Sequence, residues 1–287
     1  MRNRVLSLVL TSVLLSLCIH VSAQEIVVGH IDDVDSIFFN SAHYDGLGIT
    51  SLDDIIDKLP GAERQDDGSI TVNGKHITRI LINGKQWFPE HEYVDLGLSV
   101  KWATCNVGAS KPDENGEYFA WGETNSKEEY DWPSYKHCAG RSWDSMIKYN
   151  CDKKYGQDGY TDDKTLLESQ DDAASVNWGG SWRMPTMEEL QELIDNCNWT
   201  WTTQNGKAGY MATSKKPGFE GHSIFLPAAG DHMGSVPRSA GKMGAYLSSS
   251  LDTDCPEYAN YLFLTEEHVI GQKVQRFIGS SVRPICP

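Results

Sequence analysis

The chain has 287 residues, with 40 acidic residues against 25 Lys and Arg, a net charge of −15 and a sequence pI near 4.9. Hydrophobic residues make up 39% and charged residues 23%, which suffices for one or two packed domains and excludes a disordered or collagen-like chain. The negative charge argues against binding to the phosphates of nucleic acid or of an anionic membrane.

Residues 1–23 have the pattern of a secretory signal peptide. Arg2 and Arg4 precede an apolar run, and the segment closes on small residues at Ala23. The run is short for a membrane span, and no later segment approaches 18 apolar residues. A lipoprotein signal at Cys18 is the minor alternative, because Leu17 stands where a small residue is wanted. We expect a protein that is secreted, periplasmic or associated with the outer membrane, with no transmembrane span after cleavage.

Six cysteines follow the leader, and an even number in an exported chain favours disulfides. Sequence cannot choose among the many possible pairings. The short spacing favours Cys138 with Cys151, and Cys105 with Cys286 would tie together the ends of one domain. Cys197 and Cys255 are the remaining candidates. Neither a CxxC motif nor a Cys/His cluster is present, so we predict no metal site.

The composition changes near residue 89. Eight of the nine Trp lie between Trp102 and Trp201, and all six cysteines lie at or beyond Cys105. We therefore predict two units after the leader, residues 24–89 and residues 90–287.

The first unit is predicted to be small and rich in β-structure. Short strands are expected over 25–28 and 34–39, followed by a helix that begins after Ser51 and ends at Pro60-Gly61. Two Asn-Gly pairs, at 73–74 and 83–84, then predict tight turns in a three-stranded meander.

Residues 50–88 resemble part of the plug domain of TonB-dependent outer-membrane receptors. The resemblance rests on LPGAE at 59–63, DGSITVNGK at 67–75 and ILINGKQWF at 80–88. It implies a plug-like fold but not transport, since the rest of the chain is too short and too poor in lipid-facing alternation to supply a barrel. We expect a spacer or docking unit.

In the second unit, Thr186 and Glu189 form a capping-box pattern, and apolar residues then recur at helical spacing to about Asn196. A shorter helix is expected around residues 171–174, with Ser169 as its cap. A strand over 199–202 is expected to end at an Asn205-Gly206 turn.

Six ordered motifs in residues 92–287 resemble the Fibrobacter succinogenes major paralogous domain family. They are YVDLGLSVKWATCNVGA at 93–109, YFAWGE at 118–123, NWGGSWRMPT at 177–186, SIFLPAAG at 223–230, YLSSS at 246–250 and SVRPIC at 281–286. The resemblance implies an α+β fold of the C-type-lectin-like kind, related to formylglycine-generating enzymes.

Motifs for catalysis are missing from the sequence. The histidines are scattered, with no HExxH, GxSxG or phosphate-loop pattern. The paired late cysteines that bind copper in formylglycine-generating enzymes have no counterpart, because Cys255 and Cys286 stand in unrelated contexts. No calcium motif is present either. We predict that the protein is not an enzyme and carries no cofactor.

The aromatic residues are the remaining functional signal. Trp102, Trp178, Trp182 and Trp201 match framework motifs and are predicted to be core. A second set lies in the loop-rich segment 125–160 and could stack on sugar rings: Tyr130, Trp132, Tyr135 and Trp143. The sequence thus favours a non-catalytic binding protein for a glycan or a cell-surface protein. The alternative is a structural component of a surface appendage or envelope assembly.

Overall fold

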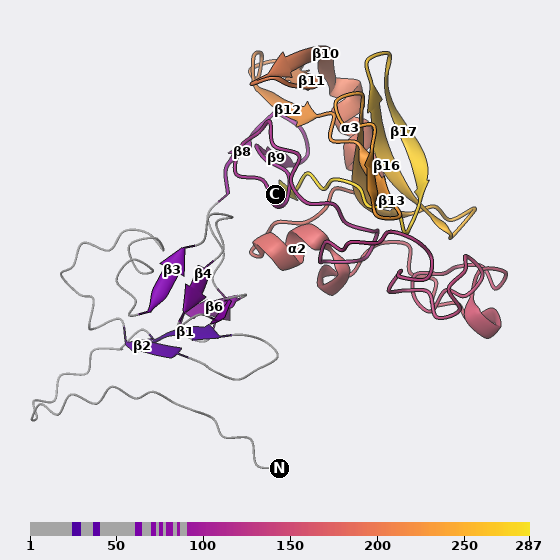
Figure 1. Ribbon diagram of the computed structural model, residues 1–287. Coiled ribbons are helices and arrows are strands. Elements are labelled where there is room, and N and C mark those ends of the chain that lie inside the picture. The colour runs from indigo at the N-terminus through magenta and orange to yellow at the C-terminus, as the bar shows by residue number, and fades with distance from the viewer. Residues whose placement is uncertain are drawn as a thin grey trace, which may run out of the picture. The chain divides into compact units, whose positions relative to one another are not determined.

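The computed structural model describes residues 25–29, 37–40, 61–64, 70–72, 75–76, 79–82, 85–86 and 91–287 (Figure 1). The predicted signal peptide and the predicted helix after Ser51 lie outside these residues. The chain divides into two compact units, Met1–Pro89 and Glu90–Pro287. Within the described part of the chain, no helix has the length and apolar character needed to cross a membrane.

The described residues of the first unit form two small antiparallel sheets. One has the order β2-β1-β6-β7 and the other the order β3-β4-β5. The strands are β1 (Glu25–Gly29), β2 (Ile37–Asn40), β3 (Ala62–Arg64), β4 (Ile70–Val72), β5 (Lys75–His76), β6 (Arg79–Ile82) and β7 (Lys85–Gln86).

The predicted three-stranded meander is wrong in its topology. The two tight connections are confirmed, because Val72 pairs with Lys75 and Ile82 pairs with Lys85, which leaves two residues in each loop. However, the single strand expected between them is split into β5 and β6. These pair in different sheets, β5 with β4 and β6 with β1.

The second unit is a mixed domain with more strand than helix, built from four small antiparallel sheets (Figure 1). Their orders are β10-β11-β12, β13-β14, β15-β16-β17 and β18-β9-β8. The strands are β8 (Tyr93–Val94), β9 (Lys101–Ala103), β10 (Cys197–Gln204), β11 (Lys207–Ser214), β12 (Ser223–Pro227), β13 (Asp231–Met233), β14 (Val236–Arg238), β15 (Met243–Leu251), β16 (Tyr258–Thr265), β17 (His268–Gln275) and β18 (Ile285–Cys286).

The predicted helix α3 (Met187–Asn196) is confirmed with its capping box. The Thr186 hydroxyl accepts from the Glu189 amide at 3.2 Å, and the Glu189 carboxylate accepts from the Thr186 amide at 2.8 Å. The helix buries Leu190 and Leu193. A side chain at Gly271 in β17 would lie 2.3 Å from Met187 Cε, so this glycine allows the helix to approach the sheet.

The predicted cap of the shorter helix is wrong. Residues Ser169–Asp171 form a 3-10 turn, and α2 (Ala173–Trp178) begins after it. Asp172 is the N-cap, because its backbone is extended and its carboxylate accepts from the Ser175 amide at 2.9 Å. The predicted strand and turn near residue 200 are confirmed as the β10–β11 hairpin, in which Asn205 and Gly206 both have positive φ.

The two ends of the domain are held together by strand pairing and by a buried arginine. Ile285 of β18 pairs with Trp102 of β9. The Arg283 guanidinium is buried and donates to Asn106 Oδ1 at 2.9 Å and to the Phe225 carbonyl at 2.9 Å. These bonds fix the first and last segments of the domain against β12.

Two hydrophobic clusters form the core of this domain. One lies around α3 and includes Trp102. The other lies between β15–β17 and the loop-rich segment, and it includes Trp121 and Trp178. The predicted core positions Trp102 and Trp178 are buried, whereas Trp182 and Trp201 are half-buried and pack against the two clusters.

Candidate binding site

The four aromatic residues predicted to bind a ligand differ in their exposure to solvent. Tyr130 is 1% exposed and Tyr135 is 2% exposed, so neither can stack on an external ring and the prediction is corrected for both. Trp132 is half-buried, with its ring 4.9 Å from that of Phe277. Trp143 is 38% exposed. Trp143 is the most exposed of the four, although Tyr155 and Lys154 already lie against part of its ring.

The two tyrosines are buried because their hydroxyl groups find partners inside the domain. Tyr130 donates to the Tyr118 carbonyl at 2.6 Å. Tyr135 donates to the Trp121 carbonyl at 2.7 Å and accepts from Arg276 Nε at 2.8 Å. Burial raises the pKa of the Tyr135 hydroxyl well above its usual range. These aromatic side chains therefore belong to the hydrophobic core although they lie in a loop-rich segment, and composition alone does not predict their burial.

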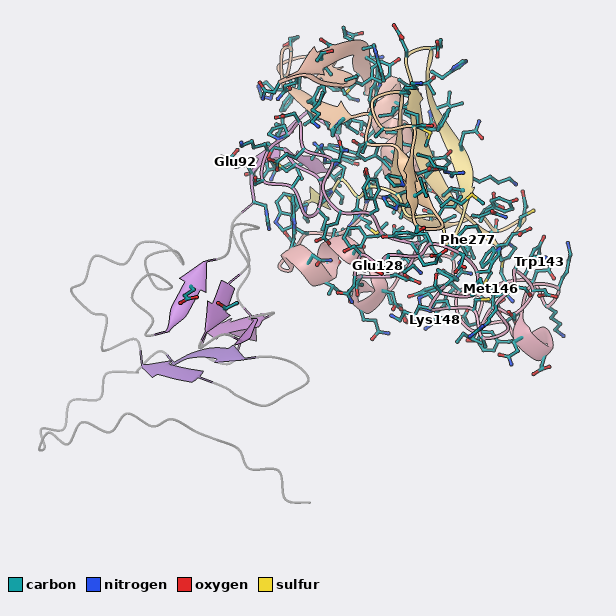
Figure 2. The ribbon with its side chains drawn as sticks, in the orientation of Figure 1. Glu92, Glu128, Trp143, Met146, Lys148 and Phe277 are labelled. Carbon is teal, nitrogen blue, oxygen red and sulfur yellow. The ribbon has the colours of Figure 1, made fainter. Side chains whose placement is uncertain are left out.

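An open cavity of about 440 Å³ lies in the same loop-rich segment. Its wall combines two ammonium groups, a carboxylate, an imidazole, an amide and one apolar side chain. The residues are Lys136, His137, Ile147, Lys148, Gln170 and Asp171. Figure 2 shows Lys148 in the loop-rich part of the domain, on the same side as Met146 and Trp143.

The centre of this site is the buried carboxylate of Asp171, in the 3-10 turn that precedes α2. Oδ1 accepts from Lys136 Nζ at 2.7 Å. Oδ2 accepts from Lys148 Nζ at 2.5 Å and from the Tyr149 hydroxyl at 2.8 Å. Burial would raise the pKa of Asp171, but the bonds from Lys136, Lys148 and Tyr149 outweigh it and hold this pKa well below its usual range.

His137 lies beside Asp171 but does not serve as its charged partner. Its Nε2 donates to the Gly122 carbonyl at 2.9 Å and is 3.8 Å from Asp171 Oδ1. Burial lowers the pKa of the imidazole to about 4, so His137 is neutral at pH 7. The ring is thus a fixed, uncharged part of the wall.

Glu168 adds an outer carboxylate to the site. It accepts from Lys148 at 2.7 Å and from Lys164 at 2.6 Å. The pKa of Lys148 rises well above its usual range, because its bonds to Asp171 and Glu168 outweigh the effect of burial. Lys148 therefore stays charged.

Arg276 holds the lysine-bearing loop on the framework of the domain. It is fully buried directly after β17. The guanidinium donates to the carbonyls of Lys148, Tyr149 and Pro256 at 3.0 to 3.1 Å, and its centre lies 4.8 Å from the Trp121 ring. One side chain thus fixes the backbone at Lys148, which positions the ammonium group of the cavity.

The predicted disulfides are not formed in the structure, where all six cysteines from Cys105 to Cys286 are free. The thiol of Cys138 is 2.9 Å from the Ser142 carbonyl and 3.1 Å from the Ser145 hydroxyl, so it is satisfied within its own loop. Cys151 instead lies near the Thr253 carbonyl, at 3.4 Å. Cys197 and Cys286 are buried, Cys105 and Cys255 half-buried. The two pairings predicted from spacing, Cys138–Cys151 and Cys105–Cys286, are corrected accordingly.

Among the described residues, no group of three or more His, Cys, Asp or Glu side chains could hold a metal ion. Two aspartates near the cavity accept hydrogen bonds from the backbone. Asp162 accepts from the amides of Tyr149 and Asn150, at 2.9 Å each. Asp172 caps α2 and accepts from the Met184 amide. Both aspartates therefore have a structural role as acceptors for backbone amides.

Comparisons with known proteins gave no match. No family model matches the chain, and neither the curated proteins nor the solved structures contain a significant relative.

Proposed function

We propose that the protein is an exported, non-catalytic binding protein, and that its second unit is a lectin-like module for a glycan or a cell-surface protein. The observation that carries the proposal is the cavity between Lys136 and Asp171. Its polar groups are fixed in place, yet the Lys136 ammonium group keeps two donors that no residue of the described structure uses. Concave sites with a few fixed polar groups are typical of ligand recognition.

The architecture supports a lectin-like module. Small antiparallel sheets and two helices carry a long segment, from about residue 104 to 172, that contains no strand or α-helix. Strands β9 and β18 join the ends of the domain, so the loops project from a closed framework. Loops held on a rigid framework are a common location for binding residues.

The local chemistry supports binding rather than catalysis. His137, the histidine of the cavity, uses Nε2 to bond a carbonyl and is neutral at pH 7. Both oxygens of Asp171 already accept hydrogen bonds. A general acid or base needs a proton position that is free to exchange with substrate. Here His137 Nε2 is bonded to a carbonyl, and Asp171 is bonded to two lysines and a tyrosine.

Export rests on the leader pattern of residues 1–23 and fits the acidic composition. We place the protein outside the cytoplasm, secreted or associated with the envelope, with the plug-like first unit as a spacer or docking unit. Because the six cysteines are free in the structure, disulfides do not support export. The proposed localisation therefore depends on the leader pattern.

A structural role in an envelope assembly is the second candidate, and one observation favours it. The β13–β14 hairpin exposes two apolar side chains, Met233 at 44% and Val236 at 61%. Exposed apolar residues at a hairpin tip suit packing against a neighbouring protein. In this case the cavity would have no ligand.

A glycan array probed with the full chain and two matched variants separates these candidates. Ile147→Asp places a charge in the cavity wall, whereas Val236→Asp places the same charge on the hairpin; both side chains are exposed, so both variants should fold. We expect glycan binding that Ile147→Asp abolishes and Val236→Asp retains. Absence of binding to any glycan, together with self-association that Val236→Asp disrupts in sedimentation velocity, would instead establish the structural role.

A further inference from the structure

We propose that the cavity recognises the anionic group of an acidic sugar, either the carboxylate of a uronic acid residue or a sulfate ester. This inference rests on the proposed binding function and specifies its ligand class. It follows from the charge, the unused hydrogen-bond donors and the rigidity of the cavity wall.

The cavity wall is positive on an acidic protein. The chain carries a net charge of −15, but the cavity holds two ammonium groups, Lys136 and Lys148, against one carboxylate, Asp171. His137 is neutral at pH 7. The neighbouring pair of Glu168 and Lys164 adds one charge of each sign, so the excess of one positive charge remains. The local excess of positive charge favours an anion here over a cation.

The exposed ammonium group has donors to offer. Each lysine has three N–H donors. Lys136 Nζ uses one on Asp171 and is 53% exposed, so two remain. Lys148 Nζ uses its donors on Asp171, Glu168 and Tyr149. The two lysines bond to opposite oxygens of one carboxylate, so Asp171 ties both ammonium groups to the cavity wall, and Lys136 offers its free donors to an anion there.

The buried carboxylate holds in place the ammonium groups that an anion would meet. Asp171 lies beneath the lysines with both oxygens occupied, so the incoming anion meets the ammonium groups first. Asp171 also fixes two long side chains that would otherwise lose rotamer freedom on binding, and Arg276 fixes the backbone at Lys148. Preorganisation of this kind strengthens binding because the ordering cost has been met on folding.

The remaining wall suits a sugar ring better than a bare anion. Ile147 is exposed beside the lysines and can lie against the apolar face of a ring. Gln170 donates through Nε2 to Glu168, which leaves its amide oxygen to accept from a hydroxyl. A ligand with one anionic group on a hydroxylated ring uses each of these groups.

The test is calorimetric titration of the full chain with three probes: an oligogalacturonate, its fully methyl-esterified form and a sulfated galactan oligosaccharide. We expect binding of the first, the third or both, which identifies the anionic group. The neutral ester should bind at least tenfold more weakly, because losing one charge-assisted hydrogen bond lowers affinity about tenfold. Lys136→Gln should weaken binding of the acidic probe about tenfold. Lys273→Gln, at an ammonium of similar exposure paired with Asp252, should change it less than twofold.

Three results would overturn the inference. The first is binding of the neutral ester as tightly as the acid, and the second is equal affinity of Lys136→Gln and the unmodified chain for the acidic probe. Absence of binding to all three probes would also refute it. If the glycan array nevertheless shows a neutral ligand that Ile147→Asp abolishes, the proposed function survives and only the acidic specificity fails.

Discussion

The substitution Arg276→Lys tests whether one buried side chain carries the cavity-bearing loop. The guanidinium makes four hydrogen bonds, to the Tyr135 hydroxyl and to the carbonyls of Lys148, Tyr149 and Pro256. A lysine keeps the charge but lacks the fork, and from a single nitrogen it can reach about one of these acceptors. Three bonds from a charged donor, each worth about 1.5 kcal/mol, predict a loss of about 4 to 5 kcal/mol.

Urea unfolding of the full chain, followed by tryptophan fluorescence, measures this loss. Eight of the nine Trp lie in the second unit, and the Trp121 ring packs on the guanidinium itself. Lys273→Gln is the control, because an exposed ion pair contributes at most about 1 kcal/mol. Since domains are stable by only about 5 to 15 kcal/mol, Arg276→Lys should unfold at much lower urea concentration.

Tyr135→Phe is a milder variant in case Arg276→Lys fails to fold. It removes only the hydroxyl that accepts from Arg276 and donates to the Trp121 carbonyl, so a loss of about 1 to 3 kcal/mol is expected. The argument that Arg276 holds the loop would be refuted if the free energy of unfolding fell by less than about 0.5 kcal/mol in Tyr135→Phe and by less than about 1 kcal/mol in Arg276→Lys. The comparison requires that the m-value for urea is the same in all variants.

Three further predictions address other parts of the domain. Thr186→Ala should lower the free energy of unfolding by about 1 kcal/mol by removing the cap of α3, and Thr186→Ser should restore it; equal urea midpoints for all three proteins would contradict this. Burial lowers the pKa of His137 to about 4, so as the pH falls the unfolded chain takes up a proton at this residue before the folded chain does. The free energy of unfolding should therefore decrease between pH 6.5 and pH 4, by up to about 3 kcal/mol from His137. Urea unfolding at pH 7 and pH 5 should show a smaller difference for His137→Gln than for the unmodified chain; an equal difference would show that His137 is not responsible. Alkylation in denaturant without reductant, followed by peptide mass spectrometry, should label all six cysteines of the second unit, whereas a Cys138–Cys151 linked peptide would contradict the free thiols.

Local patterns predicted local structure well. The Thr186–Glu189 capping box located α3 to the residue, and the Asn-Gly pairs marked hairpins in both units. These signals work because capping bonds and positive φ angles depend on neighbouring residues. The short helix was found, but its cap was misassigned, since Ser169, Asp171 and Asp172 are all cap-forming residues and the 3-10 turn decides between them.

The candidate site was missed because its members are distant in sequence. Lys136, Lys148 and Asp171 span 35 residues without a motif, and only the tertiary fold brings the two lysines to one carboxylate. The tyrosines were misplaced for a related reason. An aromatic residue in a loop-rich segment can face outward or pack inward, and the internal partners of Tyr130 and Tyr135 decide the matter. Their partners lie on segments that periodicity does not connect.

Hydrogen–deuterium exchange of the full chain, with and without the tightest glycan from the array, tests the central claim most directly. If the cavity is the binding site, slower exchange on binding should be confined to peptides covering 136–148 and 168–171, around Lys136, Lys148 and Asp171. Protection centred on the β13–β14 hairpin, with no change in those peptides, would contradict the account.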